Sequence, residues 1–264
     1  MFFLSSLIGR LVLLSVLAVV AAGAGWYFFV REDNKAQEVA ADVTDDVRRA
    51  AAASPSPAAS TATGGSPAPS ATAASTGAGG GLSSLRGASY RVVEGQGSAW
   101  YLAPEKLASL PTTSVAKGTT KEVRGEFHFT ADGLDPARKT TFTVGLASIA
   151  SDQSRRDSRM HQALETQKFP TATFTATRLA GLPAEFTAQE VEMQLTGILD
   201  LHGVQKEVTW KVQVKKDAAT NILSGLATTE FKYSDFGITK PDIAGFVTVE
   251  ENVQLQVQLF VAPA

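Results

Sequence analysis

Three histidines are the side chains best suited to metal or acid–base chemistry in this chain, because it contains no cysteine. They stand at His128, His161 and His202. Catalytic zinc sites usually take two histidines at a paired spacing on one element, such as i and i+4, and no pair here has it. The absence of cysteine also excludes disulfides, thiolate zinc sites, thiol catalysis and a lipid-modified cysteine. We therefore predict no catalytic residue, no metal site and no enzymatic activity.

Known catalytic and cofactor motifs are missing as well. The chain has no Gly-x-Ser-x-Gly elbow, no His-Glu-x-x-His helix, no phosphate-binding glycine loop and no dinucleotide fingerprint. We expect no cofactor. The formal net charge of −2 provides no basic surface for nucleic acid, which we exclude as a partner.

The stretch Leu199–Val212 reads LDLHGVQKEVTWKV, with His202-Gly203 between two apolar alternations. Glycine permits a positive φ and an imidazole can bond nearby backbone groups, so we interpret His202-Gly203 as a hairpin turn. A catalytic His202 is the less favoured alternative. We expect the apolar neighbours Leu199, Leu201, Val208 and Trp210 to face the interior.

Short runs of alternating apolar and polar residues follow Ala88 and predict β-strands that position these side chains. The clearest is VQLQVQL at Val253–Leu259, and turn residues such as Gly181-Leu-Pro183 separate the runs. We predict about eight antiparallel strands, which must close into a barrel or fold into a sandwich. The segment Ser151–Lys168 predicts one short helix, capped by Ser151 or Asp152, that covers an end of the sheet.

This helix carries a basic cluster beside apolar Met160 and Leu164. One interpretation is a solvated helix face with Asp157 paired to an arginine, and we favour it. The other is contact with a phosphate headgroup or an anionic membrane, with Arg156, Asp157 and His161 as candidate residues at the mouth. In SDFGI, we expect Asp235 to accept backbone hydrogen bonds while Phe236 and Ile238 pack.

The N-terminal part has a different composition. Residues 1–10 are expected on the cytoplasmic side, and residues 11–30 form an uncharged run long enough to cross a bilayer as a signal-anchor, at about 30 Å. Arg10 and the aromatic residues 26–29 favour this orientation. The alternative is a secretory signal peptide cleaved near Ala22-Gly-Ala24. Either one exports the rest of the chain, which is secreted if the leader is cleaved.

Three further segments follow. Residues 31–53 predict a charged stalk, for which an exposed helix and an unstructured chain are both compatible with the composition. Residues 54–87 are rich in Pro, Ser, Thr, Ala and Gly and predict a disordered linker with a mean reach of about 30 to 35 Å. Residues 88–264 predict the β domain.

Six motifs in this domain, in this order and spacing, resemble the YceI-like family of lipid- or polyisoprenoid-binding proteins. They are KGTTKEVRGEF (117–127), LASIASDQSRRDSRM (146–160), LETQKFPTATF (164–174), LTGILDLHGVQKEVTW (195–210), YSDFGITKP (233–241) and VTVEENVQLQVQLFV (247–261). The resemblance covers Tyr90–Val261. It implies an eight-stranded antiparallel, lipocalin-like barrel whose apolar lumen holds a long isoprenoid chain, in an exported or periplasmic protein that is often a homodimer.

An eight-stranded barrel either packs solid or holds one ligand. Small residues among the bulky ones, at Ala172, Ala176, Gly197, Gly225 and Ala227, favour a slot. The predicted lumen residues are Phe127, Phe129, Phe142, Val144, Met160, Phe174, Met193, Leu195, Trp210, Phe231, Leu255 and Val257.

The predicted function is a membrane-tethered binding protein of the cell envelope that holds a quinone or polyprenyl-type lipid on the extracytoplasmic side. Its partners would be that lipid, the membrane through the N-terminal helix, and a second copy in a homodimer. Two alternatives remain, a structural or adhesive envelope protein with a solid barrel and an enzyme that acts on a lipid headgroup.

Overall fold

The computed structural model describes residues 40–53, 89–108, 112–130, 133–183, 186–242 and 246–264, and residues 40–264 belong to one compact unit. The predicted membrane span at residues 11–30 and the predicted linker at residues 54–87 lie outside the described residues. Among the residues that are described, no helix has the length and the apolar character needed to cross a membrane.

Strands dominate the described part of the chain, with two α-helices and one short 3₁₀ turn. In order the elements are α2 (Asp45–Ala53), β1 (Ser89–Val92), β2 (Ser98–Leu107), β3 (Thr113–Thr120), β4 (Val123–Thr130), β5 (Gly133–Leu134), β6 (Thr141–Gly145), α3 (Ser154–Ala163), β7 (Thr171–Ala180), β8 (Val191–Leu201), β9 (Val204–Lys216), β10 (Leu223–Lys232), η1 (Tyr233–Phe236), β11 (Val247–Val249) and β12 (Asn252–Pro263).

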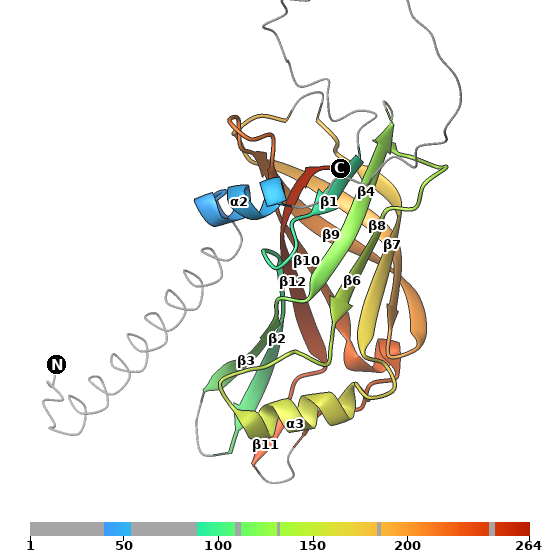
Figure 1. Ribbon diagram of the computed structural model, residues 1–264. Coiled ribbons are helices and arrows are strands. Elements are labelled where there is room, and N and C mark those ends of the chain that lie inside the picture. Colours follow the sequence, from blue (N-terminus) through green and yellow to red (C-terminus); the bar gives the residue numbers. More distant parts are fainter. Residues whose placement is uncertain (1–39, 54–88, 109–111, 131–132, 184–185, 243–245) are drawn as a thin grey trace, which may run out of the picture. The chain divides into compact units, whose positions relative to one another are not determined.

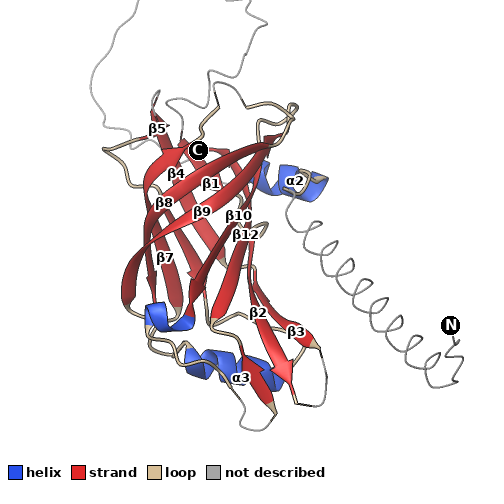
Figure 2. Ribbon diagram, turned by 180° about the vertical axis from the view of Figure 1, so that it is seen from behind, coloured by secondary structure: helices blue, strands red, loops and turns tan. Residues whose placement is uncertain are grey.

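Eight strands, all within the described ranges, pair into a closed antiparallel ring (Figure 1, Figure 2). The order around the ring is β1, β4, β6, β7, β8, β9, β10 and β12, and β12 returns to β1 through the pair Val92 and Val261. Closure leaves no free edge around the ring, so its backbone groups bond between strands. The predicted all-β class and the eight-stranded antiparallel barrel are therefore confirmed.

Beside β12, two successive strands take the place of one. β12 pairs with β1 at residues 261–263 and with β2 at residues 254–258, so β1 and β2 follow one another along the same edge. β4 pairs with β1, and β3 pairs with β2. The β2–β3 half therefore continues past the ring on the side where α3 lies, and β11 pairs with its far end (Figure 1).

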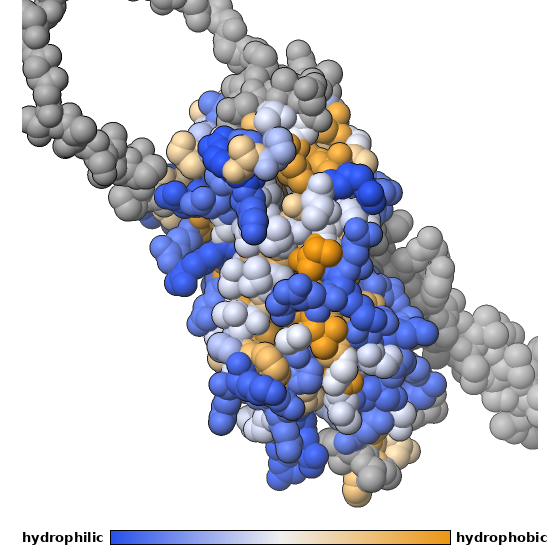
Figure 3. Space-filling model, turned by 90° about the vertical axis from the view of Figure 1, so that its right-hand side faces the viewer, coloured by the Kyte–Doolittle hydropathy of each residue, from blue (hydrophilic) through white to orange (hydrophobic). Residues whose placement is uncertain are grey.

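Side chains alternate between the two faces of the ring. On β12, Val253, Leu255 and Val257 line the interior, and Gln254 between them follows the opposite parity. Gln256 departs from this pattern, because it is buried and borders the cavity, where it accepts the indole N–H of Trp100 at 2.7 Å. Figure 3 shows one outer face of the molecule, which carries mainly hydrophilic side chains with smaller apolar spots between them. The buried apolar side chains therefore gather inside the barrel, as the alternation in the sequence predicts.

Helix α3 lies across one end of the barrel, between β6 and β7 in the chain (Figure 1, Figure 2). It occupies Ser154–Ala163, the central part of the predicted Ser151–Lys168 segment. Its apolar face brings Met160, and with it Leu164 just beyond the helix, into the buried cluster inside the barrel. This placement agrees with the expectation that the helix covers an end of the sheet.

The predicted N-terminal cap of α3 is wrong. Gln153 is the N-cap residue, and it makes no side-chain capping hydrogen bond. Ser151 instead donates its N–H and its hydroxyl to the Asp157 carboxylate, at 2.8 and 2.6 Å. That carboxylate lies in the first turn of the helix, where it also favours the positive end of the helix dipole.

Residues 40–53 pack on the outside of the barrel. Helix α2 buries Val47, which is 2% exposed, and the preceding residue Val43 is buried beside it. Both contact an apolar patch of the barrel formed by Val93, Ile222 and Phe260. The sequence led us to expect an exposed helix or an unstructured stalk here. The helix forms, but one of its faces is covered by the barrel.

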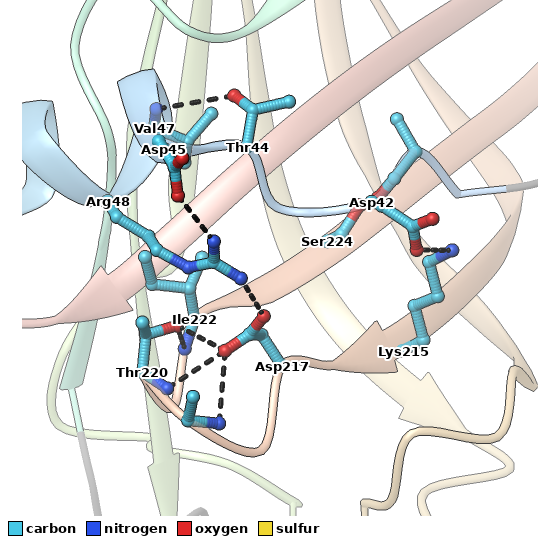
Figure 4. Close-up of polar contacts among 12 residues, drawn as sticks. Asp42, Thr44, Asp45, Val47, Arg48, Lys215, Asp217, Thr220, Ile222 and Ser224 are labelled. Atoms are coloured by element: carbon cyan, nitrogen blue, oxygen red, sulfur yellow. Dashed lines mark hydrogen bonds and ion pairs between the residues drawn. The ribbon is translucent and has the colours of Figure 1, made fainter.

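Polar contacts flank this apolar patch on both sides (Figure 4). Arg48 pairs with Asp217 at 2.8 Å, and Lys215 pairs with Asp42 at 2.6 Å. The hydroxyl of Ser224 donates to the carbonyl of Ala41. Since these partners come from the loop before β10 and its flanking strands, residues 40–53 are fixed to a defined site on the barrel.

The Arg48–Asp217 pair makes the docking of α2 dependent on pH. The hydrogen bond from Arg48, aided by Thr220, lowers the pKa of Asp217 from 3.8 to about 2. A depressed carboxylate pKa stabilises the fold above the ordinary pKa, and this contribution disappears as the pH falls from about 4 to about 2.

We predict that Asp217→Asn lowers the free energy of unfolding by about 1 kcal/mol at pH 7, after allowance for solvent screening, and has no effect near pH 2. Thermal unfolding of both proteins across this pH range measures the difference. Asp46→Asn is the matched control, because Asp46 pairs with Arg49 at an exposed position of the same helix. A loss that is equal at pH 7 and pH 2 would contradict the assignment to the ion pair.

Candidate functional site

A cavity runs inside the described part of the barrel. Its volume is about 190 Å³, more than ten times the 10–15 Å³ that one water molecule needs. The wall comes from the inward residues of the ring strands together with β2 and α3, and it carries no charged side chain among the described residues. An apolar space of this kind suits a hydrophobic ligand.

All twelve predicted lumen residues lie on the wall of this cavity. Three aromatic residues from neighbouring strands pack against one another there, since Phe127 stacks on Phe129 at 5.9 Å and contacts Phe142 edge to face at 4.3 Å. Their contact with a ligand stays a prediction.

The predicted small residues divide into two groups. Ala172, Gly225 and Ala227 line the cavity, which places open space opposite the bulky side chains. Ala176 packs against the core from a partly buried position and Gly197 faces Phe174, whose ring lies where a Cβ would stand. Only the first group therefore widens the lumen directly.

Several wall residues were missed by the sequence analysis. Ala99, Trp100 and Tyr101 belong to β2, which has no clean alternation in the sequence, and Phe186 stands alone in a loop. Of the expected Leu199, Leu201, Val208 and Trp210, all but Val208 line the cavity, and Val208 packs against the core. A signal for Tyr101 existed, because it lies two residues from Ala99 on the same face.

The three predicted mouth residues lie on α3, and each has a partner within the protein. Arg156 pairs with the buried Glu105 of β2 at 3.3 Å and with Asp152 at 2.5 Å. Asp157 accepts the two bonds from Ser151. The Nε2 atom of His161 lies 2.9 Å from the carbonyl oxygen of Ile149. These contacts hold the helix on the barrel, and a role at a headgroup stays a prediction for all three residues.

His202 and Gly203 form the turn between β8 and β9, as predicted. Their φ angles are 57° and 75°, and positive φ at both central residues is the geometry of a type I′ hairpin turn. The Nδ1 atom of His202 lies 3.1 Å from the carbonyl oxygen of Phe236. The ring also contacts Phe169 edge to face at 5.1 Å. The imidazole therefore has a structural position that joins the turn to η1.

The histidines do not converge. His128 contacts Ser89 through Nδ1 at 3.0 Å and lies on β4 away from the cavity wall, as predicted from its place between two inward phenylalanines. Within the described ranges, no group of three or more His, Asp or Glu side chains is arranged to hold a metal ion. Asp235 accepts the backbone N–H of Lys232 at 3.0 Å, which confirms its predicted turn role and lowers its pKa.

Three buried polar groups on the cavity wall have no hydrogen-bond partner among the described residues. They are the hydroxyls of Tyr101 and Tyr233 and the indole N–H of Trp210. Burial raises the pKa of Tyr101 to about 12 and raises the pKa of Tyr233 above its ordinary value. Both phenols therefore stay protonated and remain hydrogen-bond donors at neutral pH.

Comparison with known proteins points to one family. The profile of the YceI-like domain matches residues 100–261. A UPF0312 protein of Pseudomonas putida (strain W619) is 34% identical over 135 residues, which cover 48% of this chain and 66% of that protein. Protein YceI of Escherichia coli O157:H7 is 34% identical over 100 residues, covering 37% of this chain and 48% of its own length. The chain thus spans less than two thirds of these relatives.

Among solved structures, a polyisoprenoid binding domain from Saccharophagus degradans has the same fold. It superposes with a TM-score of 0.52 at 19% identity and covers 66% of this chain and 98% of that domain. At this identity the likeness concerns the fold, and it agrees with the barrel described above.

Substitutions at His202 separate its backbone role from any chemistry of the imidazole. We predict that His202→Val lowers the free energy of unfolding by about 1–2 kcal/mol more than His202→Asn, because asparagine tolerates a positive φ and a β-branched residue does not. Both variants lose the ring, so their difference isolates the turn. Chemical denaturation measures it, and equal losses would argue against the turn assignment.

Proposed function

The chain belongs to the YceI-like domain family, and from this premise we propose that it is a binding protein that encloses one long-chain isoprenoid-type lipid, of the quinone or polyprenyl kind. The observation that carries the proposal is the apolar cavity inside the closed ring, whose wall has no charged side chain among the described residues. The polyisoprenoid binding that names the S. degradans domain supports the choice of lipid.

Burial alone provides enough affinity for such a ligand. Removal of apolar surface from water contributes about 25 cal/mol per Å², and each additional isoprene unit adds to the buried area without any ionic contact. The cavity also speaks against the alternative of a solid, purely structural barrel, since a volume of about 190 Å³ remains open within it.

Binding is favoured over catalysis by the arrangement of the ionisable groups. Arg156, Asp157, His161 and Asp235 are each engaged in contacts that hold α3 or η1 in place. The wall therefore presents apolar surface, and no described histidine or carboxylate faces the enclosed ligand.

The membrane tether is part of the same proposal and rests on the sequence of residues 11–30. Because residues 40–53 dock on the barrel, the length of the tether is set by the chain between the expected span and this docked segment. Between the expected span and the docked segment lie only residues 31–39, at most about 30 Å of extended chain. Such a tether would raise the effective concentration of the membrane lipid at the barrel.

A bulky side chain in the lumen should displace the lipid. We predict that Ala227→Phe, on the cavity wall, lowers the amount of lipid that copurifies with the full chain by about tenfold, since the ring occupies the ligand's space. Organic extraction and mass spectrometry of the protein from its native host measure the amount.

Glu230→Phe is the control, because Glu230 is exposed on the same strand. Its lipid content should match that of the unchanged protein. Equal lipid content in Ala227→Phe and Glu230→Phe, with both proteins folded, would overturn the proposal that the lumen is the binding site.

A further inference from the structure

The lumen of this barrel contains polar groups that the binding of a plain hydrocarbon chain does not explain. Tyr101 and Tyr233 are 5% and 2% exposed, and both residues line the cavity. Their buried hydroxyls have no protein partner among the described residues. Buried tyrosine hydroxyls usually have a hydrogen-bond partner, because an unpaired donor in an apolar site loses its bond to water. A hydrogen-bond acceptor on a ligand inside the lumen would satisfy both O–H donors.

Both tyrosines lie at the end of the barrel that α3 covers. Tyr101 is on β2, four residues before Glu105, whose carboxylate pairs with Arg156 of α3 at 3.3 Å. Tyr233 is the first residue of η1, and its N–H donates to the carbonyl of Glu251 at 3.1 Å. Tyr101 is also among the groups whose charge acts on Tyr233, so the two phenols are electrostatic neighbours.

The backbone opposite Tyr101 holds its ring in place. Gly118 of β3 is the register partner of Tyr101, and a Cβ at this glycine would lie only 2.3 Å from the ring. The ring therefore rests on the strand at a position where only glycine leaves room. This contact restricts the rotation of the ring, so less side-chain entropy is lost when a ligand binds the phenol.

Charge at this end of the lumen selects against an anionic ligand. Arg156 is the cation whose charge acts on Tyr101, and it is already paired with Glu105 and Asp152. The other arginines of α3, Arg155 and Arg159, are exposed to solvent. A phosphate or diphosphate in the lumen would approach the carboxylate of Glu105, and that carboxylate already engages Arg156. A neutral oxygen acceptor needs only the two O–H donors.

We propose that Tyr101 and Tyr233 bind the polar head of the lipid by donating hydrogen bonds to an uncharged carbonyl-type oxygen at the α3 end of the lumen. This inference rests on the proposed function and narrows it, because it selects a quinone-type head over a prenyl phosphate. The tail then extends along the apolar wall away from α3. The proposed site does not include Trp210, which lies in the middle of β9 and packs edge to face against Phe174, with the ring centroids 6.0 Å apart.

The test compares three probes with matched tails on the delipidated full chain. They are a benzoquinone with a geranylgeranyl tail, geranylgeranyl diphosphate, and the corresponding hydrocarbon without a head. The quinone should bind most tightly to the unchanged protein. Tyr101→Phe and Tyr233→Phe should each weaken the quinone by about fivefold, the factor of one hydrogen bond, and leave the hydrocarbon unchanged.

A second readout guards against a trivial loss of structure. Among the described residues the two hydroxyls have no protein partner, so without ligand both Tyr→Phe variants should unfold at a temperature equal to or above that of the unchanged protein. With the quinone bound, the unchanged protein should unfold at a higher temperature than either Tyr→Phe variant. Tyr90→Phe is the matched control, because Tyr90 is a buried tyrosine of β1 that is not on the cavity wall. It should change neither the order of the probe affinities nor the effect of the quinone on the unfolding temperature.

The outcomes separate the two proposals. If both Tyr→Phe variants bind the quinone and the hydrocarbon as tightly as the unchanged protein does, the head site is overturned and the lipid-binding function stands. Tighter binding of the diphosphate than of the quinone would overturn the neutral head. If the unchanged protein binds none of the three probes, the proposed function itself fails.

Discussion

Closure of the ring by β12 is the constraint on which the rest of the structure depends. This strand pairs with β10 on one side and with both β1 and β2 on the other, so it joins the last strand of the chain to the first. Once the ring is closed, the strand period of two sends every second side chain into one enclosed space. The apolar wall, the cavity and the position of α3 at its end all follow from that geometry.

The closed ring also explains why unpaired polar groups in the barrel interior are candidates for ligand binding. Around the ring the backbone groups bond to neighbouring strands, and charged side chains point outward or pair at the ends, as Glu105 does with Arg156. Any buried polar atom that remains without a partner inside therefore stands out against an apolar background. The hydroxyls of Tyr101 and Tyr233 are such groups, and both lie at the end of the barrel that α3 covers.

Local patterns in the sequence predicted much of this fold. The alternation in β12 and in β8–β9 identified the inward faces, and His202-Gly203 identified the turn because both residues accept a positive φ. Features made by residues far apart in the chain could not be predicted in this way. Val47 meets Phe260 and Arg48 meets Asp217 only after the barrel has formed, and Phe186 enters the lumen from a loop without periodicity. Alternation alone left a barrel and a sandwich open, and the resemblance to the YceI-like family implied the barrel that the pairing of β12 with β1 closes.

The central claim is that the closed lumen encloses one lipid molecule, and native mass spectrometry of the intact chain purified from its host tests it most directly. The account predicts a discrete added mass that corresponds to one long-chain lipid per barrel, which persists in gentle ionisation and disappears when the protein is unfolded. A reproducible mass equal to that of the polypeptide alone, from protein that is folded and prepared without organic solvent, would contradict it.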